Sequence, residues 1–241
     1  MIRAGLFAMA LATLPGASTA QCRQALVMGL DVSGSIDANE YRLQLDGLAG
    51  ALLNPEVAQA LLVQPAAPVH LAVFEWSGPA YQRILLDWTP ITDPATLAQV
   101  ASHLTSRHRA PAPPGTALGS AMQFGAALLA DKPDCWKRTF DISGDGKHNF
   151  GPHPRDVQHT LSTLPITLNA LAIGSDSPPL GDTRQVEIAE LSSYFSAWVI
   201  SGPGAFVETA QGYHDYRAAM IRKLKRELQG LVVSALPAET P

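Results

Sequence analysis

The sequence has no excess of basic residues and few aromatic ones. It contains 17 Lys and Arg against 21 Asp and Glu, a formal net charge of −4 at pH 7, and its aromatic fraction is 7%. Proteins that bind nucleic acid usually carry a basic patch, so we expect no nucleic-acid partner. An apolar fraction of 46% excludes a disordered chain and is enough for a substantial buried core.

A membrane-spanning run is also missing. The apolar run at 4–14 has 11 residues, whereas a spanning helix needs about 20. It follows Arg3 and precedes the small residues 15–20, which is the layout of a secretory signal. We therefore expect 1–20 to be a signal peptide cleaved after Ala20, and the mature protein to be periplasmic or secreted, with no transmembrane segment. Residues 21–231 would form one domain and 232–241 a flexible tail.

Cysteine is scarce, and its two positions are informative. Cys22 and Cys135 each lie just ahead of a strand-like run. In an exported protein two cysteines can form one disulfide. If the two following strands are parallel neighbours about 4.8 Å apart, both cysteines lie at one end of the sheet, within the Cα separation that a disulfide needs. The alternative is a pair of unrelated buried thiols.

Hydrophobic periodicity predicts strands and helices in alternation. This order is typical of a mostly parallel sheet with helices on both faces. The turn at Gly78-Pro79 is too short for a parallel crossover, so the strands on either side of it must be antiparallel. The predicted strands are 24–30, 69–77, 81–88, 138–143, 166–174 and 205–210, and the predicted helices are 41–52, 56–63, 93–104, 116–130, 156–164, 184–195 and 213–231.

Polar residues directly follow the first predicted strand. Asp31, Ser33 and Ser35 form a D-x-S-x-S segment at a strand's carboxyl end, where α/β folds bind ligands. The segment has neither a phosphate-binding glycine pattern nor a nucleophile elbow. Its hard oxygen donors suit Mg²⁺, Ca²⁺ or Mn²⁺, and Thr116 and Asp145 follow later elements as further donors. The alternative is an ordinary turn with Ser35 or Asp37 as a helix N-cap.

The three segments resemble a known site. D-x-S-x-S, a Thr at the head of a helix and Asp145-Gly146 after a strand are similar to the metal-ion-dependent adhesion site of von Willebrand factor type A domains. The segments DVSGSID, GTALGSAM, DISGDGKHN and SGPGAFV further resemble a bacterial secreted branch known only as a domain of unknown function. The resemblance spans about 24–231. It implies a three-layer, doubly wound, Rossmann-like α/β fold with six strands in the order 3-2-1-4-5-6, strand 3 antiparallel and strands 1 and 4 adjacent.

The resemblance also implies a role for each residue. Ser33 and Ser35 would bind the ion directly, Thr116 directly or through water, and Asp31 and Asp145 largely through water. The expected ion is Mg²⁺, with Mn²⁺ or Ca²⁺ as alternatives. An Asp or Glu of a protein partner would complete the coordination shell, which favours a binding module over an enzyme. A hydrolase using the same ion and a purely structural ion are the alternatives.

Three further features of the sequence are a glycine near the predicted metal ligands, two histidines in the loop that follows, and a basic last helix. Gly144 stands where the resemblance expects a hydroxyl, and Asp141, in the middle of a strand, is therefore a second acidic candidate behind the ligands. The alternative, which we favour, is a buried carboxylate hydrogen-bonded to the backbone or to a Ser or Thr. His148 and His153 could border the site, although their spacing is no standard zinc pattern. The last helix is expected to present a solvated basic face made of Arg217, Arg222, Lys223, Lys225 and Arg226.

Overall fold

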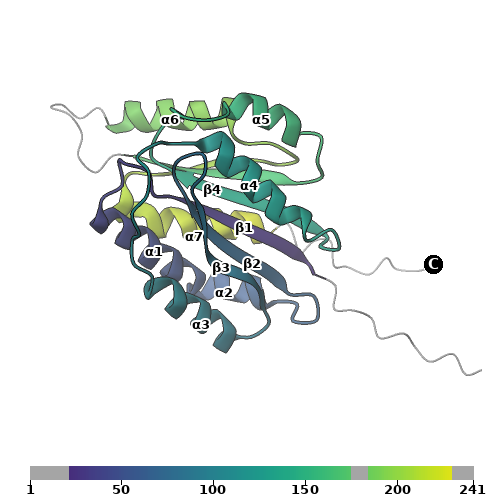
Figure 1. The fold of residues 1–241 in the computed structure, drawn as a ribbon. Coiled ribbons are helices and arrows are strands. Elements are labelled where there is room, and N and C mark those ends of the chain that lie inside the picture. The colour runs from purple at the N-terminus through teal and green to yellow at the C-terminus, as the bar shows by residue number, and fades with distance from the viewer. Residues whose placement is uncertain (1–21, 175–183, 230–241) are drawn as a thin grey trace, which may run out of the picture.

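The computed structural model describes residues 22–174 and 184–229, which build a six-stranded sheet between two layers of helices (Figure 1). The strand order is β3-β2-β1-β4-β5-β6, and all neighbours are parallel except β2 and β3. This confirms the order and the reversed third strand. The strands are β1 Gln24–Asp31, β2 Val69–Trp76, β3 Gln82–Ile91, β4 Lys137–Gly144, β5 Thr167–Ile173 and β6 Val207–Ala210.

Helices cover both faces of the sheet. One face packs against α1, α2, α3 and α7, and the other against α4, α5 and α6 (Figure 1). β1 is buried at every position because it is central, which explains why its sequence is almost entirely apolar. The helices are α1 Ala38–Leu52, α2 Pro55–Leu62, α3 Pro94–Thr105, α4 Leu118–Ala130, α5 Pro154–Leu161, α6 Arg184–Trp198 and α7 Tyr216–Gln229, with a 3₁₀ turn η1 at Tyr213–Asp215.

A disulfide joins the starts of β1 and β4. Gln24 pairs with Lys137, so the cysteines two residues before each strand face one another. The bridge between Cys22 and Cys135 has a Cα–Cα distance of 4.4 Å. The predicted disulfide is therefore confirmed.

The same register brings the opposite ends of these strands together. Leu30 pairs with Ser143, so Asp31 and the residues after Gly144 emerge at one edge of the sheet. β2 ends beside them, because Asp31 also pairs with Trp76. This edge carries the D-x-S-x-S segment.

Several boundaries differ from the sequence prediction, since β3 continues to 91 instead of 88, α1 begins at 38 instead of 41 and α5 spans 154–161 instead of 156–164. Two further differences concern the candidate site and the last helix. α4 begins at Leu118 behind Ala117, whose side chain makes no capping hydrogen bond, so Thr116 precedes the helix instead of opening it. The last helix was expected from 213, but α7 begins at Tyr216 after the 3₁₀ turn. The predicted signal peptide and the predicted tail lie outside the described residues. Among the residues that are described, no helix has the length and apolarity to cross a membrane.

Candidate metal-binding site

Asp31 is the innermost residue of the predicted site. Its side chain is fully buried, and its Oδ1 accepts a hydrogen bond from the backbone amide of Ser33 at 2.8 Å. Its Oδ2 is buried without a hydrogen-bond partner in the described part of the chain. A buried carboxylate oxygen is costly to leave unpaired, so this atom can accept a ligand that the chain itself does not supply.

Two serines and a second carboxylate lie in front of Asp31. The Ser33 and Ser35 hydroxyl oxygens are 3.4 Å apart. The Ser35 hydroxyl donates to Asp145 Oδ1 at 2.8 Å, which joins the segment after β1 to the segment after β4. Asp37, which follows, caps α1 and forms a capping box with Glu40, as predicted. It is therefore used by the helix and lies outside the group of donors.

Thr116 belongs to a third segment that is tied to the other two. Its amide donates to Asn149 Oδ1 at 2.8 Å, and the Asn149 amide donates to the Thr116 carbonyl at 3.1 Å. A Cβ placed on Gly146 would lie 3.9 Å from Thr116 Oγ1, so this hydroxyl faces the residue after Asp145. The structure therefore brings the three predicted segments to one place.

The electrostatics of this group favour a cation. Burial, and then the charge of Asp145, raise the pKa of Asp31 to about 8, and burial also raises the pKa of Asp145. Two nearby carboxylates without a positive partner resist ionising together. In the described ranges no three His, Cys, Asp or Glu side chains gather as a metal-binding group, so an ion here would be held by hydroxyls and carboxylates. That donor set fits a hard divalent cation.

Gly144 has a physical reason in this structure. A Cβ at this position would lie 3.1 Å from Asp31 Oδ2, with Trp76 and Phe195 close behind. A larger residue would press on Oδ2, the Asp31 oxygen that has no hydrogen-bond partner in the described residues. Glycine at position 144, where the resemblance expects a residue with a hydroxyl, therefore leaves space beside Asp31.

Asp141 is bound elsewhere. Its Oδ1 lies 2.6 Å from Lys223 Nζ, and Lys223 also contacts Glu227 Oε1 at 2.9 Å. Asn169 donates to the same Glu227 oxygen at 2.6 Å. Burial and Glu227 raise the pKa of Asp141 to about 8, so at neutral pH the cluster keeps a proton and carries little net charge.

The burial of Lys223 corrects the interpretation of the last helix. Lys223 has no exposed surface, whereas it was expected on a solvated basic face. A signal was available, because Lys223 and Glu227 follow Met220 at the helical spacing of the buried stripe. A buried lysine needs carboxylate partners, and the two acids supply them.

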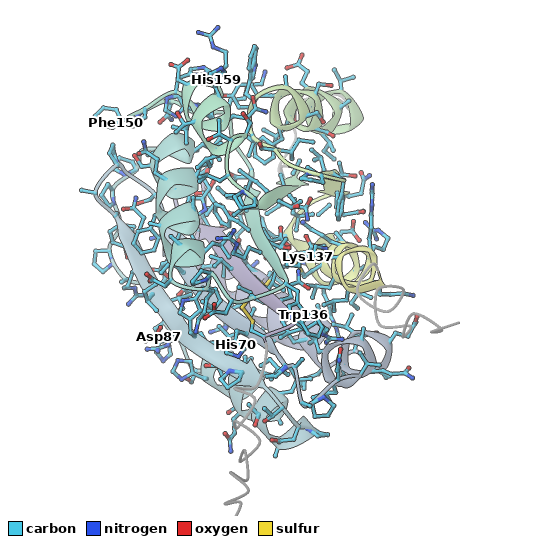
Figure 2. All side chains as sticks on the ribbon, turned by 90° about the vertical axis from the view of Figure 1, so that its right-hand side faces the viewer. His70, Asp87, Trp136, Lys137, Phe150 and His159 are labelled. Atoms are coloured by element: carbon cyan, nitrogen blue, oxygen red, sulfur yellow. A yellow bond between two sulfur atoms is a disulfide. The ribbon has the colours of Figure 1, made fainter. Side chains whose placement is uncertain are left out.

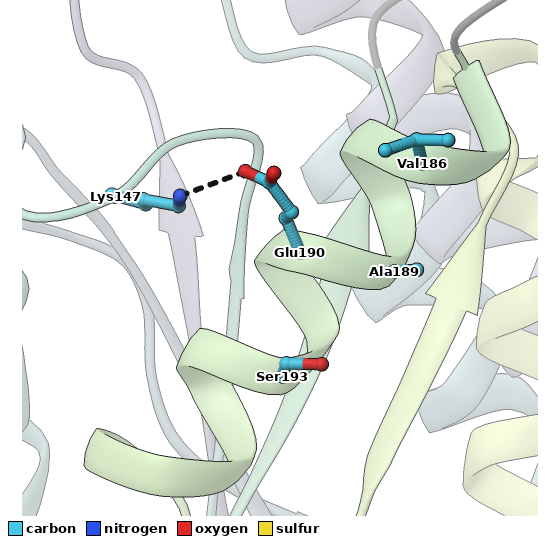
Figure 3. A pocket seen from close by; sticks show the side chains of 5 residues that line it. All are labelled: Lys147, Val186, Ala189, Glu190 and Ser193. Carbon is cyan, nitrogen blue, oxygen red and sulfur yellow. Dashed lines mark hydrogen bonds and ion pairs between the residues drawn. The ribbon is translucent and has the colours of Figure 1, made fainter.

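A hollow adjoins Asp145 on the side of α6. It measures about 250 Å³ and is lined by Asp145, Lys147, Glu187 and Glu190 among others. Lys147 reaches over from the loop after β4 and pairs with Glu190 at 3.1 Å (Figure 3). This ion pair fixes one border of the site to the helix.

The two histidines of the same loop lie together. The His148 and His153 rings have centroids 5.3 Å apart. His153 is also the N-cap of α5, because its Nδ1 accepts from the Arg155 amide at 3.2 Å. His153 therefore stabilises the start of α5 as its N-cap.

Comparisons with known proteins agree with this architecture. The family described as "Protein of unknown function (DUF1194)" matches residues 21–232. No curated protein matches. One similar solved structure is proximal thread matrix protein 1 from the mussel byssus, with zinc in its MIDAS motif, the metal-ion-dependent adhesion site. It has 13% sequence identity and a TM-score of 0.58, and the match covers 87% of this chain and 46% of that one. A second similar structure is a von Willebrand factor type A protein from Catenulispora acidiphila, with 16% sequence identity and a TM-score of 0.55. The match covers 87% of this chain and 43% of that one.

A pilus adhesin, SpaC from Lactobacillus rhamnosus GG, is a third similar structure, at 12% identity and a TM-score of 0.58, over 87% of this chain and 31% of that one. The chain thus spans less than half the length of each of these three proteins. At these identities the likeness establishes the fold, which is that of a von Willebrand factor type A domain.

Proposed function

The chain belongs to the DUF1194 family and has a von Willebrand factor type A fold, and we propose that it is an exported, divalent-cation-dependent protein-binding module. The ion would be held by Asp31, Ser33, Ser35, Thr116 and Asp145, with Mg²⁺ as the first candidate. A partner's Asp or Glu would complete the shell. The observation that carries the proposal is the buried Asp31 Oδ2, which has no hydrogen-bond partner in the described residues and lies behind two serine hydroxyls, one of which donates to Asp145 of a second chain segment.

The donor set supports binding over catalysis. Asp31 and Asp145 are the carboxylates of the group, and the Asp145 carboxylate already accepts the Ser35 hydroxyl. A hydrolase would need a general base beside an activated water, and both carboxylates are needed near the ion. The similar structures support the adhesion-type assignment, since one is named as a pilus adhesin and another as carrying zinc in a MIDAS motif. A turnover panel of esters, phosphates and peptides with Mg²⁺ tests for catalysis; metal-stimulated turnover lost in Asp145→Ala would contradict the proposal.

Export is part of the proposal. The apolar segment at 4–14 and the Cys22–Cys135 bridge both support an oxidising compartment outside the cytoplasm. Mass spectrometry of the protein recovered from the exported fraction is expected to find Gln21 as the first residue. A chain retained in the cytoplasm with Met1 in place would contradict this part.

Metal and partner binding can be tested together. We expect titration calorimetry to detect Mg²⁺ binding that Asp31→Ala abolishes, and affinity capture from the exported fraction to recover proteins with Mg²⁺ that chelator releases. Asp37→Asn is the matched control, because it removes a neighbouring charge that serves the helix cap. If Asp31→Ala leaves both the Mg²⁺ affinity and the captured proteins unchanged, the proposal is wrong. If chelator only lowers the melting temperature, the ion is structural.

A further inference from the structure

We propose that two loops beside the candidate metal site, 107–115 and 146–153, form a second contact area for the partner, which we term the collar. The collar would take an acidic peptide segment that carries a large apolar side chain next to the metal-binding carboxylate. This inference rests on the proposed function, because it places the collar beside the position of that carboxylate.

The apolar part of the collar centres on Phe150. Its side chain is 61% exposed and points outward at the edge of the molecule (Figure 2). The preceding residue, Asn149, makes both hydrogen bonds to Thr116, and a Cβ placed on Gly115 would lie 3.4 Å from Phe150 Cβ, so Phe150 adjoins the residue before this predicted metal ligand. An exposed aromatic side chain is typical of the centre of a protein interface.

The loop that carries Phe150 is held in place. Gly151 has φ +86°, a conformation that favours glycine, and it turns the chain beside Pro79. A Cβ on Gly119 would lie only 2.0 Å from the Pro152 carbonyl oxygen, so this glycine lets the loop lie directly on α4. A loop backbone held in this way loses little conformational entropy when a partner covers it.

Exposed prolines extend the apolar surface. A Cβ on Gly34 would lie 2.8 Å from Pro114 Cβ, and the Gly34 amide donates to the Pro114 carbonyl at 3.0 Å. Pro113 stands equally close to Gly78, at 3.0 Å from a Cβ placed there. Pro114 therefore joins the D-x-S-x-S segment to the loop before Thr116, Pro113 joins that loop to the turn at Gly78, and both prolines are exposed.

The charge of the collar indicates the sign of the partner. The two loops contain three Lys or Arg, three His and no Asp or Glu, in a chain whose net charge is −4. Lys147 is already paired with Glu190, so the positive charge offered to a partner comes from Arg107 and Arg109. Arg109 donates to the carbonyls of Val32 and Ser33 at 3.3 and 3.5 Å, and Arg107 donates to the Leu85 carbonyl at 2.9 Å. Their positive charges are directed at carbonyl oxygens, so they remain available to attract an acidic segment.

The geometry limits the spacing in the peptide. Phe150 and Thr116 belong to segments joined by direct hydrogen bonds, so the apolar side chain must lie close in sequence to the metal-binding acid. At about 3.3 Å per residue in an extended peptide, one to three residues would separate the two. Further acidic residues in the same segment would face Arg109 and the neighbouring histidines.

A peptide selection tests the collar. Random nine-residue peptides displayed on phage are selected in Mg²⁺ on the immobilised mature protein, and the enriched peptides are synthesised and measured by fluorescence anisotropy. We expect an Asp or Glu with an aromatic or large aliphatic residue within three positions, release by chelator, and at least tenfold weaker binding by Phe150→Ala. Trp136→Ala is the matched control, since Trp136 is 54% exposed beside the disulfide (Figure 2). It is expected to change the affinity less than twofold.

The outcomes separate this inference from the proposed function. Acidic, Mg²⁺-dependent peptides that bind Phe150→Ala as well as the parent protein would overturn the collar and leave the proposed function standing. Peptides indifferent to Mg²⁺, or no enrichment, would overturn both. Self-association that light scattering detects in the parent protein and that Phe150→Ala abolishes would show that a second copy covers the collar, and would overturn the inference. Unchanged melting of Phe150→Ala confirms that the variant is folded.

Discussion

Asp31 and Asp141 lie on neighbouring strands of one sheet and meet different electrostatic surroundings. Both side chains are almost fully buried, at 0% and 2% exposure, and burial raises the pKa of each to about 8. Asp141 has a cation from the chain, because Lys223 lies 2.6 Å away. Asp31 faces hydroxyls, a backbone amide and the carboxylate of Asp145. A buried carboxylate that is paired with a cation of the chain, such as Asp141, has a structural role. A buried carboxylate without such a cation, such as Asp31, is available to a metal ion.

Removing the internal cation should have the largest effect. Lys223→Met leaves Asp141 and Glu227 buried together without a positive partner, so we expect a loss of about 3 kcal/mol in the free energy of unfolding. Urea denaturation of the variant and the parent protein measures this difference in the free energy of unfolding. The control is Lys225→Met, whose partner Glu56 is exposed and whose loss should cost well under 1 kcal/mol. A loss below 1 kcal/mol in Lys223→Met would mean that Lys223 does not neutralise the cluster.

Adding Mg²⁺ should distinguish the two aspartates. An ion at about 100 times its dissociation constant stabilises a folded protein by about 2.7 kcal/mol. We expect thermal denaturation to show this gain in the parent protein and in Asp141→Asn, and to show little of it in Asp31→Asn. Equal gains in both variants would contradict the assignment of the ion to Asp31.

The pH dependence of the free energy of unfolding, measured without metal, should also distinguish Asp31 from Asp141. Between about pH 4 and 8 the folded protein keeps the Asp31 proton while the unfolded chain releases it, so stability falls as pH rises through this window. Denaturation at pH 5, 6.5 and 8 measures the slope. We expect Asp31→Asn to flatten it, and Mg²⁺ to flatten it in the parent protein, while the part due to Asp141 remains. An unchanged slope in Asp31→Asn would show that Asp31 ionises normally.

The smallest effect concerns the space beside Asp31. Gly144→Ala places a methyl group about 3.1 Å from Asp31 Oδ2, so we expect Mg²⁺ affinity in calorimetry to fall several-fold, on the order of 1 kcal/mol. Gly146→Ala is the matched control, because its methyl group would have an ordinary 3.9 Å contact with Thr116. If both variants bind Mg²⁺ equally well, Gly144 does not make room for an ion.

Much of the fold could be predicted because its signals are local. Alternating apolar runs indicated the strands, Gly78-Pro79 indicated the antiparallel pair, and Cys22 and Cys135 indicated a shared sheet end. The position of Thr116 before α4 was missed, since the residue that precedes this helix as its N-cap is Ala117, which makes no side-chain capping hydrogen bond. Boundaries of this kind depend on hydrogen bonds to distant loops, here from Ala117 to Ser77 at 2.8 Å.

The sequence by itself determined which donors follow β1 and β4, since Asp31, Ser33, Ser35 and Asp145 each come directly after or at the end of a buried strand. Only the tertiary structure decided which buried acid receives a cation from the chain. Lys223 reaches Asp141 because α7 packs against the sheet face to which that aspartate points, a contact between segments far apart in the sequence. The sequence prediction placed Lys223 on a solvated face despite its helical spacing from Met220, because burying a charged residue normally costs more free energy than leaving it in water.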